Sequence, residues 1–211
     1  MTPSTLKHQL IKYLTDVHSI ERQEQEMADR IESLFDRAVD ASLDGRSTDD
    51  LGEQLNKYLA DTHAIEVQAT TLLEKGPELA GDRELAEAYE SHLAETKDHL
   101  RLIDARLEAR AASASKLKDL AMKAGALNWG AFFSAQPDTP AKLAGFAYAF
   151  EHLEVGAYEL LRHVAERAGD QQTVEVATQI LGQERAAADK LNSLFDRAMD
   201  VSLHEQDVAV G

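Results

Sequence analysis

Four glutamates interrupt apolar stripes of helical spacing, and this pattern constrains the fold of the chain more than any other feature. Apolar residues that recur at steps of three and four lie on one face of an α-helix. A carboxylate on such a buried face costs several kcal/mol unless it is paired or binds a metal. The glutamates are Glu66, Glu95, Glu154 and Glu184. Because they come from four separate stripes, they indicate a cation in the middle of a helical bundle.

The stripes fall into two predicted helical hairpins. In chain order they are Leu55, Leu59, Thr62, Glu66, Ala69 and Leu73; Leu85, Tyr89, His92, Glu95 or Thr96, His99 and Ile103; Phe146, Phe150, Glu154, Ala157, Leu161 and Val164; and Val174, Ala177, Leu181, Glu184, Ala188, Leu191 and Phe195. Gly76-Pro77 and Gly169-Asp170 are the predicted hairpin turns. Counted from these turns at about 1.5 Å per residue, the two glutamates of each hairpin lie level within roughly one turn. The paired carboxylates can therefore face one another.

The composition of the 211 residues favours an all-α fold, with 44% hydrophobic but only 6% aromatic residues and few β-branched runs. The absence of cysteine excludes disulfides and iron–sulfur clusters. A formal net charge of -16 argues against nucleic-acid binding, which needs clustered lysine and arginine. No signal-peptide pattern and no apolar run of about 20 residues is present, so we predict a cytoplasmic protein that does not enter the membrane.

The periodicity predicts an amphipathic helix over about 4–43 and bundle helices over about 49–75, 82–111, 140–169 and 170–205. A looser segment, about 112–139, separates the hairpins and is long enough to cross the bundle. Two hairpins joined by a long crossover are the ferritin-like arrangement of a four-helix bundle. We therefore divide the chain into an N-terminal helix, residues 1–46, as a candidate dimerisation element, and a four-helix bundle, residues 47–211.

The N-terminal segment repeats parts of the bundle. Residues 13–21 match 58–66 at an offset of 45, and residues 33–43 match 193–203 at an offset of 160. The second offset places Glu24 on Glu184. One hypothesis is that this helix pairs with its copy in a homodimer, whose second core holds Glu21 and Glu24 from each chain. The alternative is a remnant of gene fusion that packs on the main bundle.

The candidate metal ligands are carboxylates and an imidazole. Iron and manganese take carboxylate oxygen and imidazole nitrogen, and two such ions need about six protein ligands in a bundle. The predicted ligands are Glu66, Glu95, His99, Glu151, Glu154 and Glu184. The alternative is a buried polar network of glutamate, histidine and lysine without a metal, with Glu151 in contact with solvent.

Other polar and aromatic residues near these positions receive mainly structural interpretations. His92 is interpreted as a helix histidine hydrogen-bonded to a neighbouring glutamate, although it stays an alternative ligand to His99. His63, one turn before Glu66, is a candidate to orient a carboxylate, and His152 is predicted to point to the surface. The residues assigned to packing are Phe146, Phe150, Tyr58, Tyr89, Tyr148 and Tyr158.

Four motifs that occur in order resemble the YciF-like family of ferritin-like stress proteins. They are Tyr58-Leu-x-Asp-x-His-x-Ile-Glu66, His92-Leu-x-Glu-Thr-x-x-His99, Glu151-His-x-Glu154-x-x-x-Tyr158 and Gln183-Glu184. The resemblance covers about residues 50–200, and the third motif is also similar to rubrerythrin. It implies a dimeric ferritin-like bundle with a di-iron or di-manganese site and a link to stress response. Ferritins and rubrerythrins usually carry Glu-x-x-His on the second and fourth helices, whereas Asp98 follows Glu95 and Ala187 follows Glu184 at that spacing.

These observations leave two functional interpretations, and whether the protein is an enzyme stays open. In the first, it binds two iron or manganese ions that react with oxygen or peroxide under stress, as in a di-iron oxidase or peroxidase. In the second, it is a non-catalytic helical scaffold whose buried glutamates form a polar network or bind a structural metal. A third interpretation, iron storage in a cage, is disfavoured because the sequence predicts no separate short fifth helix at the C-terminus.

Overall fold

The computed structural model describes residues 33–110 and 139–205. The chain divides into two units, residues 1–45 and 46–211, which are described separately here. In the first unit, residues 33–43 form an α-helix, and Gly45 follows it at a φ of 72°. Glu21, Glu24 and the repeat at residues 13–21 lie outside the described residues, so the homodimer hypothesis stays a prediction.

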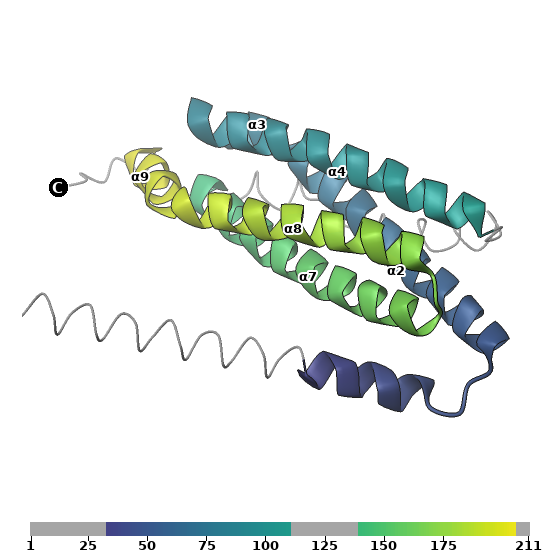
Figure 1. Cartoon of the computed structure of the whole chain (residues 1–211). Helices are drawn as coiled ribbons and strands as arrows, with labels where there is room; N and C mark the ends of the chain where they lie inside the picture. Colours follow the sequence, from purple (N-terminus) through teal and green to yellow (C-terminus); the bar gives the residue numbers. More distant parts are fainter. Residues whose placement is uncertain (1–32, 111–138, 206–211) are drawn as a thin grey trace, which may run out of the picture. The chain divides into compact units, whose positions relative to one another are not determined.

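The second unit is a bundle of four long helices and two short ones within its described residues (Figure 1). The helices are α2 (Thr48–Leu73), α3 (Gly76–Leu79), α4 (Arg83–Ala109), α7 (Thr139–Arg167), α8 (Gln171–Ser193) and α9 (Phe195–Glu205). α2 and α4 form one antiparallel hairpin, and α7 and α8 form the other. α2 packs on α4 and α7, and α8 packs on α7 and α4, so the long helices close around one core.

The two hairpins are joined as the sequence predicts, by a connection between opposite ends of the bundle. Arg110, directly after α4, donates to Asp170 at the end of the second hairpin turn (2.7 Å) and to the carbonyl of Gly52 near the start of α2 (3.0 Å). The C-terminal ends of α4 and α7 therefore lie together, and these two helices run parallel. Residues 111–138 consequently connect the end of α4 to the distant start of α7, which is the ferritin-like connection.

Polar side chains begin the helices close to the predicted positions. Ser47 and Asp50 form a capping box at the start of α2, and the side chain of Asp82 accepts from the first backbone N–H groups of α4. Asp170 accepts from the backbone N–H of Thr173 at the start of α8 (3.0 Å). Each of these side chains satisfies backbone donors that a helix leaves without partners in its first turn. Local chemistry therefore sets where the hairpins turn.

Two connections differ from the sequence predictions. The helix predicted over 170–205 is interrupted at Leu194, so α9 is a separate short C-terminal helix, and it packs on α7. The expectation of no such helix is therefore wrong. The predicted Gly76-Pro77 turn instead begins α3, in keeping with the preference of proline for a first turn. A Cβ on Gly76 would lie 2.7 Å from the ring of Tyr89, so glycine lets this turn approach α4.

The inward face of α7 also differs from the predicted one. Phe146, predicted as core, is 40% exposed. The buried face of the helix instead contains Leu143, Ala147, Glu151, Glu154, Tyr158 and Leu161. Both series satisfy the three- and four-residue spacing because α7 carries apolar residues on adjacent faces, and packing against α2 and α8 selects between them. None of the described helices has the length and apolar character needed to cross a membrane.

Candidate metal centre

Three buried polar side chains from the first hairpin meet at the middle of the bundle. Glu66 of α2 and His99 of α4 are completely buried, and His92 of α4 is 7% exposed. The two histidines lie two turns apart and therefore share the inner face of α4. Thr96 lies between them, and its hydroxyl donates to the carbonyl of His92 (3.0 Å), so it adds no free donor to this face.

Three glutamates from the second hairpin face these residues. Glu151 and Glu154 lie one turn apart on α7, and Glu184 comes from α8. Glu154 and Glu184 are completely buried and Glu151 is 2% exposed. The burial of Glu151 contradicts the alternative in which this residue contacts solvent, while its role as a metal ligand stays a prediction.

The six side chains form two groups that share one carboxylate. In the first group, ligand atoms of His92, Glu151, Glu154 and Glu184 all lie within 4.8 Å of one another. The second group, with the same spacing, comprises Glu66, His99 and Glu184. Nε2 of His92 is 2.8 Å from Glu151 Oε2 and 3.7 Å from Glu184 Oε2.

The other oxygen of Glu184 faces the second histidine. Nδ1 of His99 is 2.8 Å from Glu184 Oε1 and 3.4 Å from Glu66 Oε1. Glu184 therefore presents one carboxylate oxygen to each group. This is the arrangement that a carboxylate needs to bridge two metal ions in a helical bundle.

The residues present fit a cation better than a self-sufficient polar network. Neither oxygen of Glu154 has a hydrogen-bond partner among the described residues, and the same is true of Glu66 Oε2. The inward nitrogens of His92 and His99 lie close to carboxylate oxygens but without hydrogen-bond geometry. A buried carboxyl without a partner costs about 1–3 kcal/mol or more. A cation at the point where these atoms converge would remove that cost.

Burial and mutual repulsion favour the protonated form of three of the glutamates. The pKa of Glu154 lies well above its ordinary value because the carboxyl is buried, and the charges of Glu66, Glu184 and Glu151 raise it further. Burial also raises the pKa of Glu66, and it raises the pKa of Glu151 to about 7. The metal-free cluster therefore retains protons, which a bound cation would displace.

The carboxylates keep the two histidines charged when no metal is bound. Burial alone would lower the pKa of His92, but Glu151 and Glu184 outweigh it and raise this pKa to about 9. Burial likewise opposes the charge on His99, while Glu184 and Glu66 raise its pKa to about 10. Burial also disfavours the charge on Glu184, yet His99 and Glu151 lower its pKa. Glu184 is consequently the carboxylate that stays ionised most readily.

Further polar groups lie behind the ligand candidates and orient them. The Nδ1 atom of His92 is 3.4 Å from Glu95 Oε2, and Nε2 of His99 is 3.3 Å from Gln183 Oε1. When each of these ring nitrogens donates its proton outward, the other nitrogen presents its lone pair to the cluster. The Tyr158 hydroxyl donates to Glu66 Oε1 at 2.5 Å. Each of these contacts fixes the orientation of a side chain in the cluster.

Five of the six predicted ligands lie in the buried cluster, and one lies outside it. The structure brings together Glu66, His99, Glu151, Glu154 and Glu184, but Glu95 lies behind His92 with its side chain 46% exposed. His92 takes part in the cluster although the sequence favoured a structural interpretation, and its position two turns before His99 on the buried stripe was the available signal. Tyr158, assigned to packing, also contacts the cluster.

The two remaining histidines of the sequence analysis lie away from the cluster. Nε2 of His63 is 3.2 Å from Asp104 Oδ1, so His63 faces α4 rather than the carboxylate of Glu66. His152 is exposed, as the sequence predicts, and its Nδ1 atom lies 3.1 Å from the carbonyl oxygen of Tyr148.

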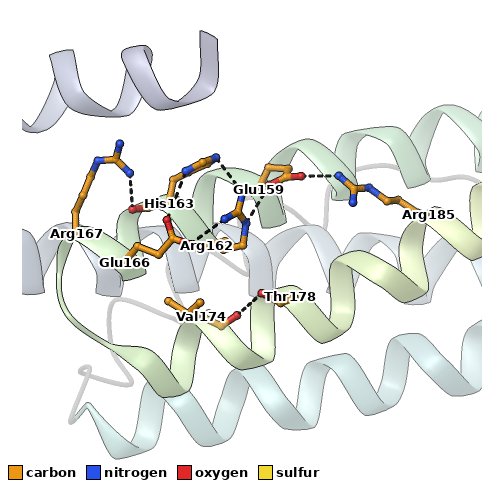
Figure 2. A network of polar contacts seen from close by, with 8 residues as sticks. All are labelled: Glu159, Arg162, His163, Glu166, Arg167, Val174, Thr178 and Arg185. Atoms are coloured by element: carbon orange, nitrogen blue, oxygen red, sulfur yellow. Dashed lines mark hydrogen bonds and ion pairs between the residues drawn. The ribbon is translucent and has the colours of Figure 1, made fainter. Parts of the chain in front are cut away.

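An ion-pair network flanks the centre on α7 and α8 (Figure 2). Glu159 Oε2 accepts from Arg162 on its own helix (2.9 Å), and Oε1 accepts from Arg185 of α8 (2.6 Å). Glu159 follows Tyr158 in the sequence, and Arg185 follows Glu184. The network therefore ties together the two helix segments that carry these residues. Because the Arg185 side chain is 58% exposed, this ion pair contributes only about 0–1 kcal/mol to stability.

Comparisons with known proteins cover the same part of the chain as the bundle. The family model described as "Domain of unknown function (DUF892)" matches residues 50–204. A crystal structure of a protein from Xanthomonas campestris pv. campestris is 26% identical, with 75% of this chain and 99% of that chain covered and a TM-score of 0.62. The crystal structure of the E. coli stress protein YciF is 22% identical, with 74% of this chain and 98% of that chain covered and a TM-score of 0.55.

These matches agree with the sequence motifs. All four motifs lie within the residues that the family model covers, and both solved structures are matched over nearly their whole length. The structural likeness also supports the ferritin-like connection of the two hairpins. The chain therefore belongs to the DUF892 family, the YciF-like proteins with a ferritin-like fold.

Proposed function

We propose that this protein binds two iron or manganese ions in the bundle core and that the loaded centre reacts with oxygen or peroxide under stress. The observation that carries the proposal is the position of Glu184, whose two oxygens lie next to different histidines at 2.8 Å and 3.7 Å. A single buried carboxylate between two nitrogen-containing groups suits a pair of ions better than one ion. The relationship to a stress protein supplies the physiological context.

The ligands can be assigned from the two groups. His92, Glu151 and Glu154 would hold one ion together with Glu184, and Glu66 and His99 would hold the other with the same Glu184. Four ionised carboxylates and two neutral imidazoles carry a charge of -4, which two divalent cations balance. Iron or manganese would supply the electron transfer that the side chains of this site do not provide.

The chain itself provides orientation, exclusion of water and proton exchange. Tyr158 holds Glu66, while Glu95 and Gln183 hold the histidines from behind. The six side chains of the two ligand groups are at most 7% exposed, so water has little access to the cluster except beside His92. Loading would release the protons that burial retains on the glutamates and that the neighbouring carboxylates retain on the histidines, and metal affinity should therefore increase with pH.

The proposal is tested by metal content. Protein purified without chelators, and protein loaded anaerobically with Fe(II), should contain about two ions per chain if both groups are ligand sets. Glu184→Ala should lose both ions, since it removes the shared carboxylate, whereas Glu175→Ala on the exposed face of the same helix is the matched control. Absence of metal in the wild type after loading would refute the proposal and favour the scaffold interpretation.

Reaction with oxidants is a separate measurement. Exposure of the Fe(II)-loaded protein to oxygen or hydrogen peroxide should give an absorbance change that Glu184→Ala lacks. Metal retention without any such reaction would instead support a structural metal.

Formation of a homodimer through residues 1–46 stays a prediction, which light scattering of the full chain and of Glu21→Ala/Glu24→Ala can test.

A further inference from the structure

A pocket of about 320 Å³ lies between α4 and α8, directly beside the candidate metal centre. His92 lines it and also belongs to the first ligand group. The space exists because the facing walls carry small side chains, namely Ala88 and Ser91 on α4 and Ala186 and Ala187 on α8. The pocket therefore leads from the surface to the outer side of His92, where its Nδ1 atom faces Glu95.

The size of the pocket exceeds what oxygen or hydrogen peroxide needs. An apolar cavity of about 150 Å³ is large enough to hold benzene, and pockets for small organic ligands begin at about 300 Å³. This pocket of about 320 Å³ is open to solvent on one side, so it can take a molecule of the size of a substituted benzene as a partly exposed ligand. A site that served only oxygen or hydrogen peroxide would not need this width.

The lining indicates the chemistry of the occupant. The alanines and Leu191 offer an apolar surface, while Glu95 and Lys190 place one charge of each sign at the exposed part. Ser91 and Gln183 also line the pocket and add a hydroxyl and a side-chain amide to it. A neutral molecule with an apolar body and a polar oxygen end matches this lining.

We propose that this pocket binds organic hydroperoxides, with the hydrocarbon part between the alanines of α4 and α8 and the peroxide group next to His92. The inference rests on the proposed function and narrows its oxidant to this class. Cleavage of the O–O bond takes up two electrons and two protons and yields one alcohol and one water. Two Fe(II) ions held by the two ligand groups would supply the electrons, each becoming Fe(III), and solvent would supply the protons.

The first experiment measures binding without any redox chemistry. The full-length, metal-free chain is titrated with 2-phenylpropan-2-ol, the unreactive alcohol that corresponds to cumene hydroperoxide, and binding is followed by ligand-observed NMR. Ala187→Leu places a larger side chain on the pocket wall and should weaken binding at least about tenfold, which corresponds to about 1.4 kcal/mol. Ala94→Leu, on the exposed face of α4, is the matched control and should bind within about twofold of wild type.

The second experiment compares two oxidants on the Fe(II)-loaded full chain by stopped-flow absorbance. Ala187→Leu should slow oxidation by cumene hydroperoxide at least about tenfold and change oxidation by hydrogen peroxide less than about twofold, because the smaller oxidant still passes. Ala88→Leu narrows the pocket from α4 and should show the same selectivity. Circular dichroism and metal content verify that each variant folds and loads.

The outcomes separate this inference from the proposed function. No alcohol binding to the wild type, or equal binding to Ala187→Leu, would overturn the pocket assignment while leaving the metal centre intact. Equal slowing of both oxidants would overturn the selectivity for organic hydroperoxides. Failure of the wild type to load iron would refute the proposed function and the oxidant assignment with it, whereas the alcohol titration would still decide whether the pocket is a ligand site.

Discussion

Replacement of Glu154 by methionine separates the metal-centre interpretation from the polar-network interpretation. Glu154 is completely buried, and neither of its oxygens has a hydrogen-bond partner among the described residues. If the carboxyl exists to bind a cation, the metal-free protein retains it at a cost. Methionine has a similar length, no charge and enough flexibility to fill the same space. We therefore expect Glu154→Met to stabilise the metal-free protein and to reduce its stabilisation by metal strongly.

The magnitude follows from the environment of the carboxyl. An unsatisfied buried polar group costs about 1–3 kcal/mol, and replacing buried ionic groups by apolar ones has stabilised proteins by about 1–4 kcal/mol. We expect the free energy of unfolding of metal-free Glu154→Met to increase by about 1–3 kcal/mol. Wild type at a free metal concentration 100 times its Kd should gain about 2.7 kcal/mol for each bound ion, and the variant should gain much less.

The assay is urea unfolding followed by far-UV circular dichroism, with and without Fe(II) under anaerobic conditions. Glu175→Met, on the exposed face of α8, is the control and should change stability by less than about 0.5 kcal/mol in either condition. A loss of more than about 1 kcal/mol in metal-free Glu154→Met would refute the reasoning. It would show that the carboxyl stabilises the fold through a polar network, as the scaffold interpretation requires.

Three further predictions concern the centre and the end of the bundle next to the second hairpin turn. Stability of the metal-free protein should fall as pH rises, because Glu151 and His99 bind their protons more tightly in the folded than in the unfolded state. The stabilisation from protonated Glu151 should be lost between about pH 4.5 and 7, and that from protonated His99 between about pH 6.5 and 10. Urea unfolding at a series of pH values measures this loss. Asp170→Asn keeps the helix cap but loses the ion pairs to Arg106 (2.9 Å) and Arg110 (2.7 Å). It should lower the free energy of unfolding in urea by about 1–3 kcal/mol, a value between those of exposed and buried ion pairs. Tyr158→Phe removes the hydroxyl that donates to Glu66 and should lower metal affinity about 10–100-fold in competition with a chelator.

Much of the fold follows from local chemistry that can be read along the chain. The helix starts near Ser47, Asp82 and Asp170 are set by side chains that accept from first-turn N–H groups, and the apolar stripes identify four long helices. The same stripes identify the buried glutamates Glu66 and Glu184, because each of them occupies a position on the buried face of its helix. These features depend on contacts within one helix, which is why sequence reasoning finds them.

The composition of the cluster depended on packing between helices. Glu95 and Thr96 are adjacent in the sequence and lie about 100° apart on the helix, so both fit the predicted stripe of α4. In the structure Thr96 is buried and Glu95 is half-exposed, which leaves His92 as the inward residue of that turn. The same ambiguity placed Phe146 in the core, although that residue is 40% exposed.

The sequence by itself determined an all-α bundle of two hairpins with carboxylates at matching depth, because helical periodicity and hairpin length are properties of short segments. Only the tertiary structure decided that Glu184 faces both histidines, that Tyr158 holds Glu66, and that a pocket opens beside His92. These features arise from the rotation of each helix about its own axis. That rotation is set by the packing of all the helices together, and a single stripe specifies it only to within about one residue.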